Sequence, residues 1–234
     1  TPQWRVHCTG AFRLGNKVFK DLHVHGSVDM ISAIQQSCNV YFYQLMLKTG
    51  LDEWAYYGRE LGFGMLTGID IAEENPGLLP STAWKRDAFK QKSAQVWFPG
   101  ETVIAGIGQG YDMVTPLQLI TAYAALANGG RLYRPQIVRR IVDSKGKTIR
   151  TIKPEVVRKL PIDSSLLKVM RVASRNVLVV RHTYNFVDVP LVIAGKSGTA
   201  EYGVRDSKGR LPFHSWFVGW LPKDPHRQAG DPNG

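Results

Sequence analysis

Two strand-like runs near the C-terminus constrain the fold most strongly. Residues 191–194 (Leu-Val-Ile-Ala) are apolar and lead directly into residues 196–200 (Lys-Ser-Gly-Thr-Ala). Residues 215–220 (Ser-Trp-Phe-Val-Gly-Trp) form the second run, on the far side of the turn-rich residues 206–212. Two such runs joined by turn residues predict an antiparallel hairpin. Its first strand would carry a lysine and two hydroxyl groups.

Helical patterns accompany these strands. Apolar residues recur at three- and four-residue spacing over 29–47, which predicts a helix. The clearest helix start is Thr115, a capping residue followed by Pro116 at the first helical position. Residues 137–142 and 148–152 flank a Ser-Lys-Gly turn and predict a second hairpin. The sequence thus predicts an α/β (α+β) fold with helices packed on a mainly antiparallel sheet.

Size and charge limit the functional classes. A chain of 234 residues with 44% hydrophobic content suits one domain with a real core. Residues 1–26 are rich in Gly and His and are expected to be irregular, and residues 222–234 to form a loose tail. No apolar run is long enough to span a membrane, so any anchor is expected outside this chain. The net charge of +11 comes from scattered basic residues without a nucleic-acid fold motif, which disfavours nucleic-acid binding.

Residues 37–39 (Ser-Cys-Asn) carry groups suited to acyl transfer. An acyl-serine enzyme needs a nucleophilic hydroxyl, a group that takes its proton, donors for the oxyanion and a clamp for the substrate. If Ser37 lies in a connection between helices or on a distorted turn, its side chain and that of Asn39 can point into one cleft. Ser37 could then relay a proton, and Asn39 could hold a substrate amide through its donor and acceptor.

The lysine-containing strand offers the complementary groups. Lys196 supplies a cation, and the hydroxyls of Ser197 and Thr199 would recognise a carboxylate. Gly198 lets a backbone approach a ligand closely. The backbone N–H of Thr199 would face the cleft as an oxyanion donor.

Each of these short patterns also occurs by chance, and the chain contains such copies. Residues 48–50 (Lys-Thr-Gly) match the lysine motif but end a predicted helix, where Gly50 acts as a terminator. The Ser-x-x-Lys pattern of a nucleophile occurs at residues 144–147, in a predicted hairpin turn. It occurs again at residues 165–168, on an ordinary amphipathic helix. We therefore expect no nucleophile within this chain.

Five ordered blocks resemble class B penicillin-binding proteins, and their spacing is similar to the elongation type, penicillin-binding protein 2. The blocks are residues 37–44, 67–70, 106–110, 115–118 and 195–200. The resemblance implies a serine β-lactamase/DD-peptidase-like fold that is incomplete at both ends, that is, a partial transpeptidase domain. In that family the nucleophile motif precedes the Ser-x-Asn motif, so here it would lie before Thr1. Residues 174–189 lack the Gly/Thr-rich loop of the family, so residues could be missing there.

The resemblance also implies an activity and partners. It implies a DD-transpeptidase that cross-links peptidoglycan stem peptides and is acylated by β-lactams, at the extracytoplasmic face of the bacterial cell membrane. Membrane proteins of cell-wall elongation, including a glycosyltransferase, would be partners. Catalysis would need no cofactor. Two alternatives remain open: a non-catalytic β-lactam sensor or scaffold of the same fold, and a serine β-lactamase.

A group of potential metal ligands lies near the N-terminus. Cys8, Asp21, His25 and Cys38 offer thiol, carboxylate and imidazole groups, which are zinc ligands. In some penicillin-binding protein 2 relatives that this chain resembles, a metal is bound by the middle residue of the Ser-x-Asn motif and an upstream His and Asp. We expect a structural rather than catalytic zinc. The alternatives are a free buried Cys38 with surface histidines, or a disulfide between the two cysteines.

Overall fold

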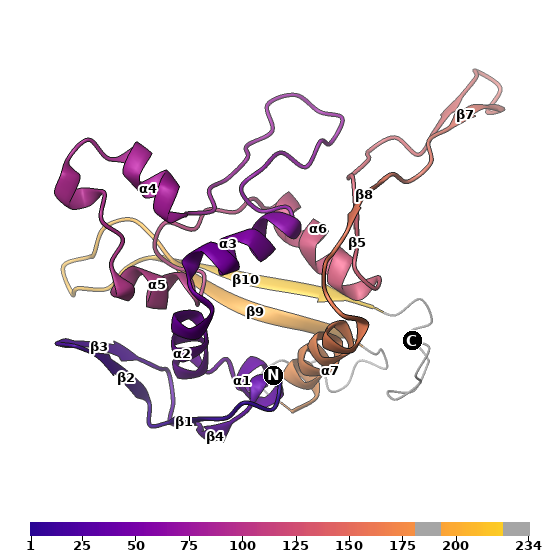
Figure 1. The fold of residues 1–234 in the computed structure, drawn as a ribbon. Coiled ribbons are helices and arrows are strands. Elements are labelled where there is room, and N and C mark those ends of the chain that lie inside the picture. Colours follow the sequence, from indigo (N-terminus) through magenta and orange to yellow (C-terminus); the bar gives the residue numbers. More distant parts are fainter. Residues whose placement is uncertain (181–192, 222–234) are drawn as a thin grey trace.

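The centre of the molecule is an antiparallel hairpin of β9 (Ala194–Glu201) and β10 (Phe213–Trp220) (Figure 1). The structure is a computed structural model that describes residues 1–180 and 193–221. Helix α7 (Ser164–Val180) packs on β9, and α6 (Pro116–Ala127) packs on β10. The hairpin predicted around the lysine motif is confirmed, although residues 191–192 and the predicted tail lie outside the described residues.

The N-terminal segment is not irregular, so that prediction was wrong. Strand β1 (Val6–Cys8) pairs with β4 (Gly26–Val28), and β2 (Ala11–Leu14) pairs with β3 (Lys17–Lys20). These strands have three or four residues, which is too short for a visible alternation of apolar and polar residues. The pairing of β1 with β4 is instead fixed by tertiary contacts, because Val6, Cys8 and Val28 are buried in the same core cluster.

The long helix predicted over residues 29–47 is divided in two. Helix α1 (Met30–Gln36) begins at Asp29, whose carboxylate accepts the N–H of Ser32 at 3.0 Å. Helix α2 (Asn39–Thr49) starts after a break at Ser37 and ends at Gly50, the predicted terminator, which has a φ of 81°. Helix α3 (Leu51–Glu60) follows directly. The apolar pattern is continuous across the break because both helices bury residues in the core, so periodicity alone could not reveal it.

The segment between α3 and α6 contains short elements: α4 (Thr82–Ala88), the 3₁₀ turn Lys92–Ala94 and α5 (Pro99–Ala105). The start predicted for α6 is confirmed. The Thr115 hydroxyl accepts the N–H of Gln118 at 3.1 Å, and the Gln118 side chain accepts the N–H of Thr115 at 3.0 Å. This reciprocal cap fixes where α6 begins and therefore where it packs on β10.

A second pair of hairpin strands leaves the body of the molecule. Strand β5 (Arg131–Tyr133) pairs with β8 (Val156–Lys159), and the chain between them continues outward as β6 (Arg140–Val142) and β7 (Thr148–Thr151) (Figure 1). The hairpin predicted around the Ser-Lys-Gly turn is confirmed. All strand pairs of the described residues are antiparallel, and each sheet there has two strands.

The fold class is the predicted one, with helices packed on antiparallel strands. One core cluster joins β1 and β4 to α2, and another joins α1 to α7. Among the described residues, no helix has the length and apolar character needed to cross a bilayer.

Candidate functional site

Ser37 lies at the break between α1 and α2, in a backbone conformation that serine rarely adopts. Its φ of 56° and ψ of 45° are left-handed. Within the described part of the chain, Glu73 is the only other non-glycine residue with a positive φ. Such strain persists where the surrounding structure fixes it, frequently at functional sites. The N–H of Cys38 donates to the carbonyl of Ala33 at 2.9 Å, which closes α1 before the chain restarts as α2.

Lys196 contacts Ser37 from the central hairpin. Its Nζ donates to the Ser37 Oγ at 2.6 Å and to the carbonyl of Ser197 at 2.9 Å. The two residues are 159 positions apart in the sequence, so only the tertiary fold can bring them together. A hydrogen bond from an ammonium group is stronger than one between neutral partners. The structure thus joins the two segments that were predicted to share a site.

A glycine pair lets β9 and β10 approach closely beside Lys196. Gly195 lies opposite Gly219 in the register. A Cβ on Gly195 would lie 2.6 Å from the carbonyl oxygen of Val218, far inside a normal contact. The residue before Lys196 must therefore be glycine for the hairpin to keep this geometry.

Thr199 lies three residues further along β9 and is exposed. Its carbonyl accepts a hydrogen bond from Nε2 of Gln109 at 3.3 Å. In an antiparallel strand, the N–H and C=O of one residue point to the same side. The Thr199 N–H therefore also lies on the edge of β9 that faces away from β10.

Gln109 is a site neighbour that the sequence analysis did not single out. It lies in the glycine-rich turn after α5 and connects that turn to β9. A glutamine between Gly108 and Gly110 in a turn was the available signal. Of the remaining predicted residues, Asn39 is the first residue of α2, two positions after Ser37, and Ser197 and Gly198 lie on β9 between Lys196 and Thr199.

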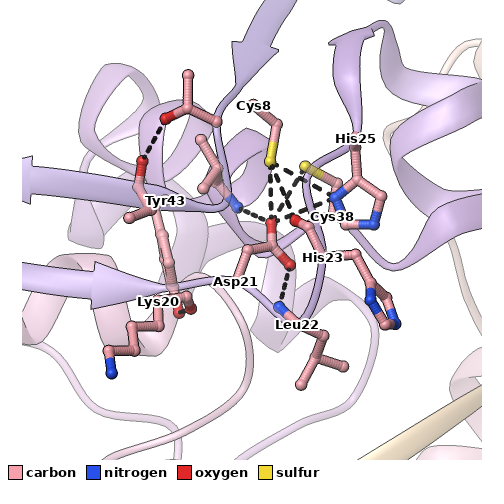
Figure 2. A network of polar contacts seen from close by, with 11 residues as sticks. Cys8, Lys20, Asp21, Leu22, His23, His25, Cys38 and Tyr43 are labelled. Atoms are coloured by element: carbon pink, nitrogen blue, oxygen red, sulfur yellow. Dashed lines mark hydrogen bonds and ion pairs between the residues drawn. The ribbon is translucent and has the colours of Figure 1, made fainter.

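The four predicted metal ligands form one cluster (Figure 2). Cys8 on β1, Asp21 after β3, His25 before β4 and Cys38 before α2 place their ligand atoms within 4.8 Å of one another. The Asp21 carboxylate lies 3.4 Å from the Cys8 Sγ and 3.3 Å from the Cys38 Sγ. The Nδ1 of His25 lies 3.5 Å from both the Cys8 Sγ and the Asp21 carboxylate.

These separations suit a tetrahedral ion. Ligands at about 2.0–2.3 Å from a zinc ion lie roughly 3.3–3.8 Å apart from each other. The donor set of two thiols, one imidazole and one carboxylate is also one that zinc accepts. The side chains of His25 and Asp21 are 4% and 0% exposed, so water does not compete at the cluster. Both cysteines are free thiols, so the disulfide alternative does not occur in this structure.

Hydrogen bonds lower the pKa of Asp21, and burial raises the pKa of Cys38. Burial raises the pKa of Asp21, but the N–H groups of Val40 and Leu22 outweigh it and lower the pKa below its ordinary value. The Val40 N–H donates at 2.9 Å and the Leu22 N–H at 2.8 Å. Burial, together with hydrogen bonds to Cys8 and Asp21, raises the pKa of the Cys38 thiol. A bound cation would reverse the preference of the thiol, because it favours the thiolate.

The competing copies of the motifs lie elsewhere. Lys48 is exposed at the end of α2, where its ammonium lies over the ring of Trp4. Ser144 and Lys147 belong to the turn between β6 and β7 and are exposed. Ser165 lies in the first turn of α7, and it too is exposed. None of these residues has a hydrogen bond to Ser37 or Lys196 within the described structure.

Comparisons with known proteins agree with this geometry. The family model described as penicillin binding protein transpeptidase domain matches residues 5–229. The chain is 31% identical to the peptidoglycan D,D-transpeptidase MrdA of Haemophilus influenzae, over 96% of this chain and 36% of that protein. It is 37% identical to the protein of the same name from Acinetobacter baumannii, over 86% of this chain and 30% of that protein. The chain therefore spans about a third of the length of these curated relatives.

Solved structures show the same fold. The PBP2 of Pseudomonas aeruginosa in complex with WCK 5153 superposes with a TM-score of 0.75 at 35% identity, covering 94% of this chain and 46% of that one. The PBP2 of Helicobacter pylori in complex with MreC gives a TM-score of 0.76 at 27% identity, covering 95% and 39%. A chain from a peptidoglycan synthase complex gives 0.77 at 31% identity, covering 99% and 37%. The chain therefore belongs to the family of penicillin-binding protein transpeptidase domains, and to its penicillin-binding protein 2 type.

Proposed function

We propose that the chain forms most of the active-site wall of a peptidoglycan DD-transpeptidase that works through an acyl-serine intermediate. The contact between the Lys196 Nζ and the Ser37 Oγ carries this proposal. A half-buried lysine that donates to a serine hydroxyl can move a proton to and from a reacting group. The relatives named D,D-transpeptidase support the reaction class.

The remaining groups would bind the substrate. In this mechanism Asn39 holds the amide of the donor stem peptide, and the hydroxyls of Ser197 and Thr199 hold its terminal carboxylate. The Thr199 N–H stabilises the oxyanion, a role supported by its position on the outer edge of β9. Gln109 fixes the Thr199 carbonyl and thereby the direction of that N–H.

The attacking serine comes, in this proposal, from sequence that precedes Thr1. The exposed positions of Ser144 and Ser165 support this assignment, because a solvated serine lacks the enclosed setting in which a lysine can take its proton. The attack would release the terminal D-alanine and leave the donor peptide as an ester on that serine. The amine of a second stem peptide would then take the acyl group, which restores the serine hydroxyl.

Labelling with a fluorescent penicillin tests the proposal. The complete protein should form a covalent adduct that survives denaturation, and the 234-residue chain alone should form none. An adduct on the chain alone would show that one of its own serines attacks, which contradicts the assignment. A complete protein that also forms no adduct would instead be a non-catalytic sensor or scaffold of this fold. Turnover of the adduct within seconds would identify a β-lactamase.

We propose further that Cys8, Asp21, His25 and Cys38 hold a structural zinc ion. The ion would tie β1 and the segment after β3 to the start of α2. Ser37 lies two residues before that start. Metal analysis of the freshly purified protein should find about one zinc per chain, and a chelator should lower the melting temperature. Protein without zinc, whose melting temperature a chelator leaves unchanged, would contradict the proposal.

The partners and location follow from the relatives as proposals. Peptidoglycan stem peptides and β-lactams would bind at the Lys196 site. The neighbours solved with MreC and in a peptidoglycan synthase complex support cell-wall elongation membrane proteins, including a glycosyltransferase, as partners. Such a protein would work at the extracytoplasmic face of the bacterial cell membrane.

A further inference from the structure

The hairpin of β6 and β7 stands out from the body of the molecule (Figure 1). We call residues 137–153 the arm. Its base is fixed by two contacts: the Ile137 N–H donates to the Asp70 carboxylate at 3.3 Å, and Gln136 Nε2 donates to the Lys153 carbonyl at 2.9 Å. In the described structure the hydrogen bonds of residues 139–152 stay within the arm. The arm is therefore held at one end and uncovered beyond it.

The arm is densely basic. Its only acidic residue is Asp143, whose carboxylate accepts the backbone N–H groups of Lys145 and Lys147 at 3.0 and 2.8 Å. Its six basic residues are Arg139, Arg140, Lys145, Lys147, Arg150 and Lys153. Within residues 1–180 and 193–221, none of these six side chains forms an ion pair. The arm thus presents a local positive field that the rest of the described molecule does not neutralise.

Aliphatic side chains are interleaved with these charges. Ile137 and Ile149 are 63% and 67% exposed, and Val138, Ile141 and Val142 are 41–44% exposed. An isolated two-stranded hairpin is marginally stable in water, and clustered exposed aliphatic residues mark interaction surfaces. The composition therefore indicates a surface that another molecule covers.

The distribution of basic and aliphatic side chains over the two faces of the β6–β7 ribbon limits which kind of partner can cover it. Ile141 lies opposite Arg150, and Arg140 lies opposite Thr151, so neighbouring pairs place an arginine on each face of the ribbon. A membrane-binding ribbon would separate an apolar face from a basic one, which this arm does not do. A hydrated polyanion would use the charges and leave the aliphatic side chains without a partner. A protein segment that carries both acidic and aliphatic residues satisfies both features.

The two strand edges are not equivalent. The register shifts between Ile141 and Val142, because Arg150 and Thr148 are their respective partners and Ile149 has none. The extra residue therefore bulges on β7, and a bulge weakens an edge as a pairing template. Strand β6 keeps a regular outer edge. Apart from β7, no strand of the described residues pairs with it.

From these observations we propose that the β6 edge of the arm is a docking site for an acidic, aliphatic-rich strand of another protein. The strand pairs with β6 through main-chain hydrogen bonds, the mode known as β-augmentation. Its carboxylates meet the arginines, and its aliphatic side chains cover Ile141 and its neighbours. This inference is independent of the acyl-transfer function, because the arm contains no residue of that site.

A synthetic peptide tests the proposal directly. The probe is a peptide of about twelve residues that alternates glutamate with valine and isoleucine, long enough to pair along β6. Binding to the protein should weaken with salt and should slow amide hydrogen exchange over residues 137–142. Two further probes, polyglutamate and phosphatidylglycerol vesicles, separate the other sources of negative charge. Equal binding of either one would overturn the proposal, as would the absence of peptide binding at low salt.

Matched variants locate the site. Arg140→Glu with Arg150→Glu should lower the affinity for the peptide on the order of tenfold or more, because it places like charges together. The control, Lys90→Glu with Lys92→Glu, makes the same change in net charge at two exposed residues away from the arm. Ile141→Thr, which keeps a β-branched side chain, should lower the affinity severalfold. Equal losses in the control and the arm variant would show attraction to net charge alone and would contradict the proposal.

Discussion

The β9–β10 hairpin and the β6–β7 hairpin are both antiparallel two-stranded ribbons, but only the first is covered by helices. Helices α7 and α6 pack on β9 and β10, and the register there is unbroken from Ala194 to Glu201. In the described structure β6 and β7 pair only with each other, all their residues are exposed, and their register shifts within three residues.

The presence or absence of covering helices determines how precisely each ribbon can position its side chains. Because helices hold β9, Lys196 is kept within hydrogen-bond distance of Ser37, which lies on another element. Precise placement of reacting groups of this kind is worth large factors in rate. The arm lacks such support, so it can present side chains to a partner but cannot fix them to within a fraction of an ångström. The predictions below test this division.

The largest expected effect separates the lysines of the two hairpins. Lys196→Ala should slow acylation of the complete protein by fluorescent penicillin by about 10²–10⁴-fold, because it removes the proton-moving partner of Ser37. Lys147→Ala, in the exposed turn of the arm, should leave the rate unchanged. Stopped-flow acylation rates measure both. A fall in rate for Lys147→Ala comparable to that for Lys196→Ala would remove the functional contrast between the ribbons.

Core truncation should show the same contrast in stability. Leu178 on α7 is 5% exposed and packs in the cluster that joins α7 to α1, so Leu178→Ala should cost about 2–5 kcal/mol. Ile149 on β7 is 67% exposed, and Ile149→Ala should change the free energy of unfolding by less than about 0.5 kcal/mol. Urea unfolding of both variants is the measurement. A cost above about 2 kcal/mol for Ile149→Ala would mean that the arm is buried in solution.

A buried carboxyl outside the arm makes the stability of the protein depend on pH. Asp112 follows the glycine-rich turn, and burial raises its pKa from 3.8 to about 7, with no hydrogen-bond partner for either oxygen in the described structure. Between these two values the folded protein keeps a proton that the unfolded chain releases. Stability should therefore fall as the pH rises from about 4 to about 7, by at most about 1.4 kcal/mol per pH unit.

Asp112→Asn should flatten this slope, because it removes the titrating group. Urea unfolding at several pH values in that window measures the slope for the parent and the variant. Asp143→Asn in the arm keeps an acceptor oxygen and serves as the control. An unchanged slope in Asp112→Asn would show that Asp112 does not titrate in this range.

Part of this architecture was predictable from the sequence. The hairpins around Lys196 and around residues 144–146 were predicted because turn residues separate β-rich runs, a signal that is local. The start of α6 was predicted because Thr115 and Pro116 are a complete local signal. The cluster of Cys8, Asp21, His25 and Cys38 was predicted from residue type and resemblance, since nothing local indicates that these four meet.

The failures have a common physical cause. The break at Ser37 is invisible to periodicity because both α1 and α2 bury apolar residues at helical spacing. Strand β1 is too short to show alternation, and its long-range pairing with β4 determines it. The hydrogen bond from Gln109 to Thr199 joins residues 90 positions apart, and no local rule predicts such a contact. Tertiary contacts decided each of these features.

The smallest expected effect compares the turns of the two hairpins. Gly146 and Gly209 have φ values of 80° and 76°, and a Cβ on either would meet nothing within 4 Å. Alanine at either position therefore carries the same conformational cost, about 1–2 kcal/mol. In the arm this cost is a large share of the local stability, so Gly146→Ala should speed tryptic cleavage after Lys145 severalfold. In Gly209→Ala, cleavage after Lys208 should rise less, because the helices that hold β9 and β10 limit how far the turn can open. Timed digestion with mass spectrometry measures both rates, and equal increases would show that helix packing does not reach the turn.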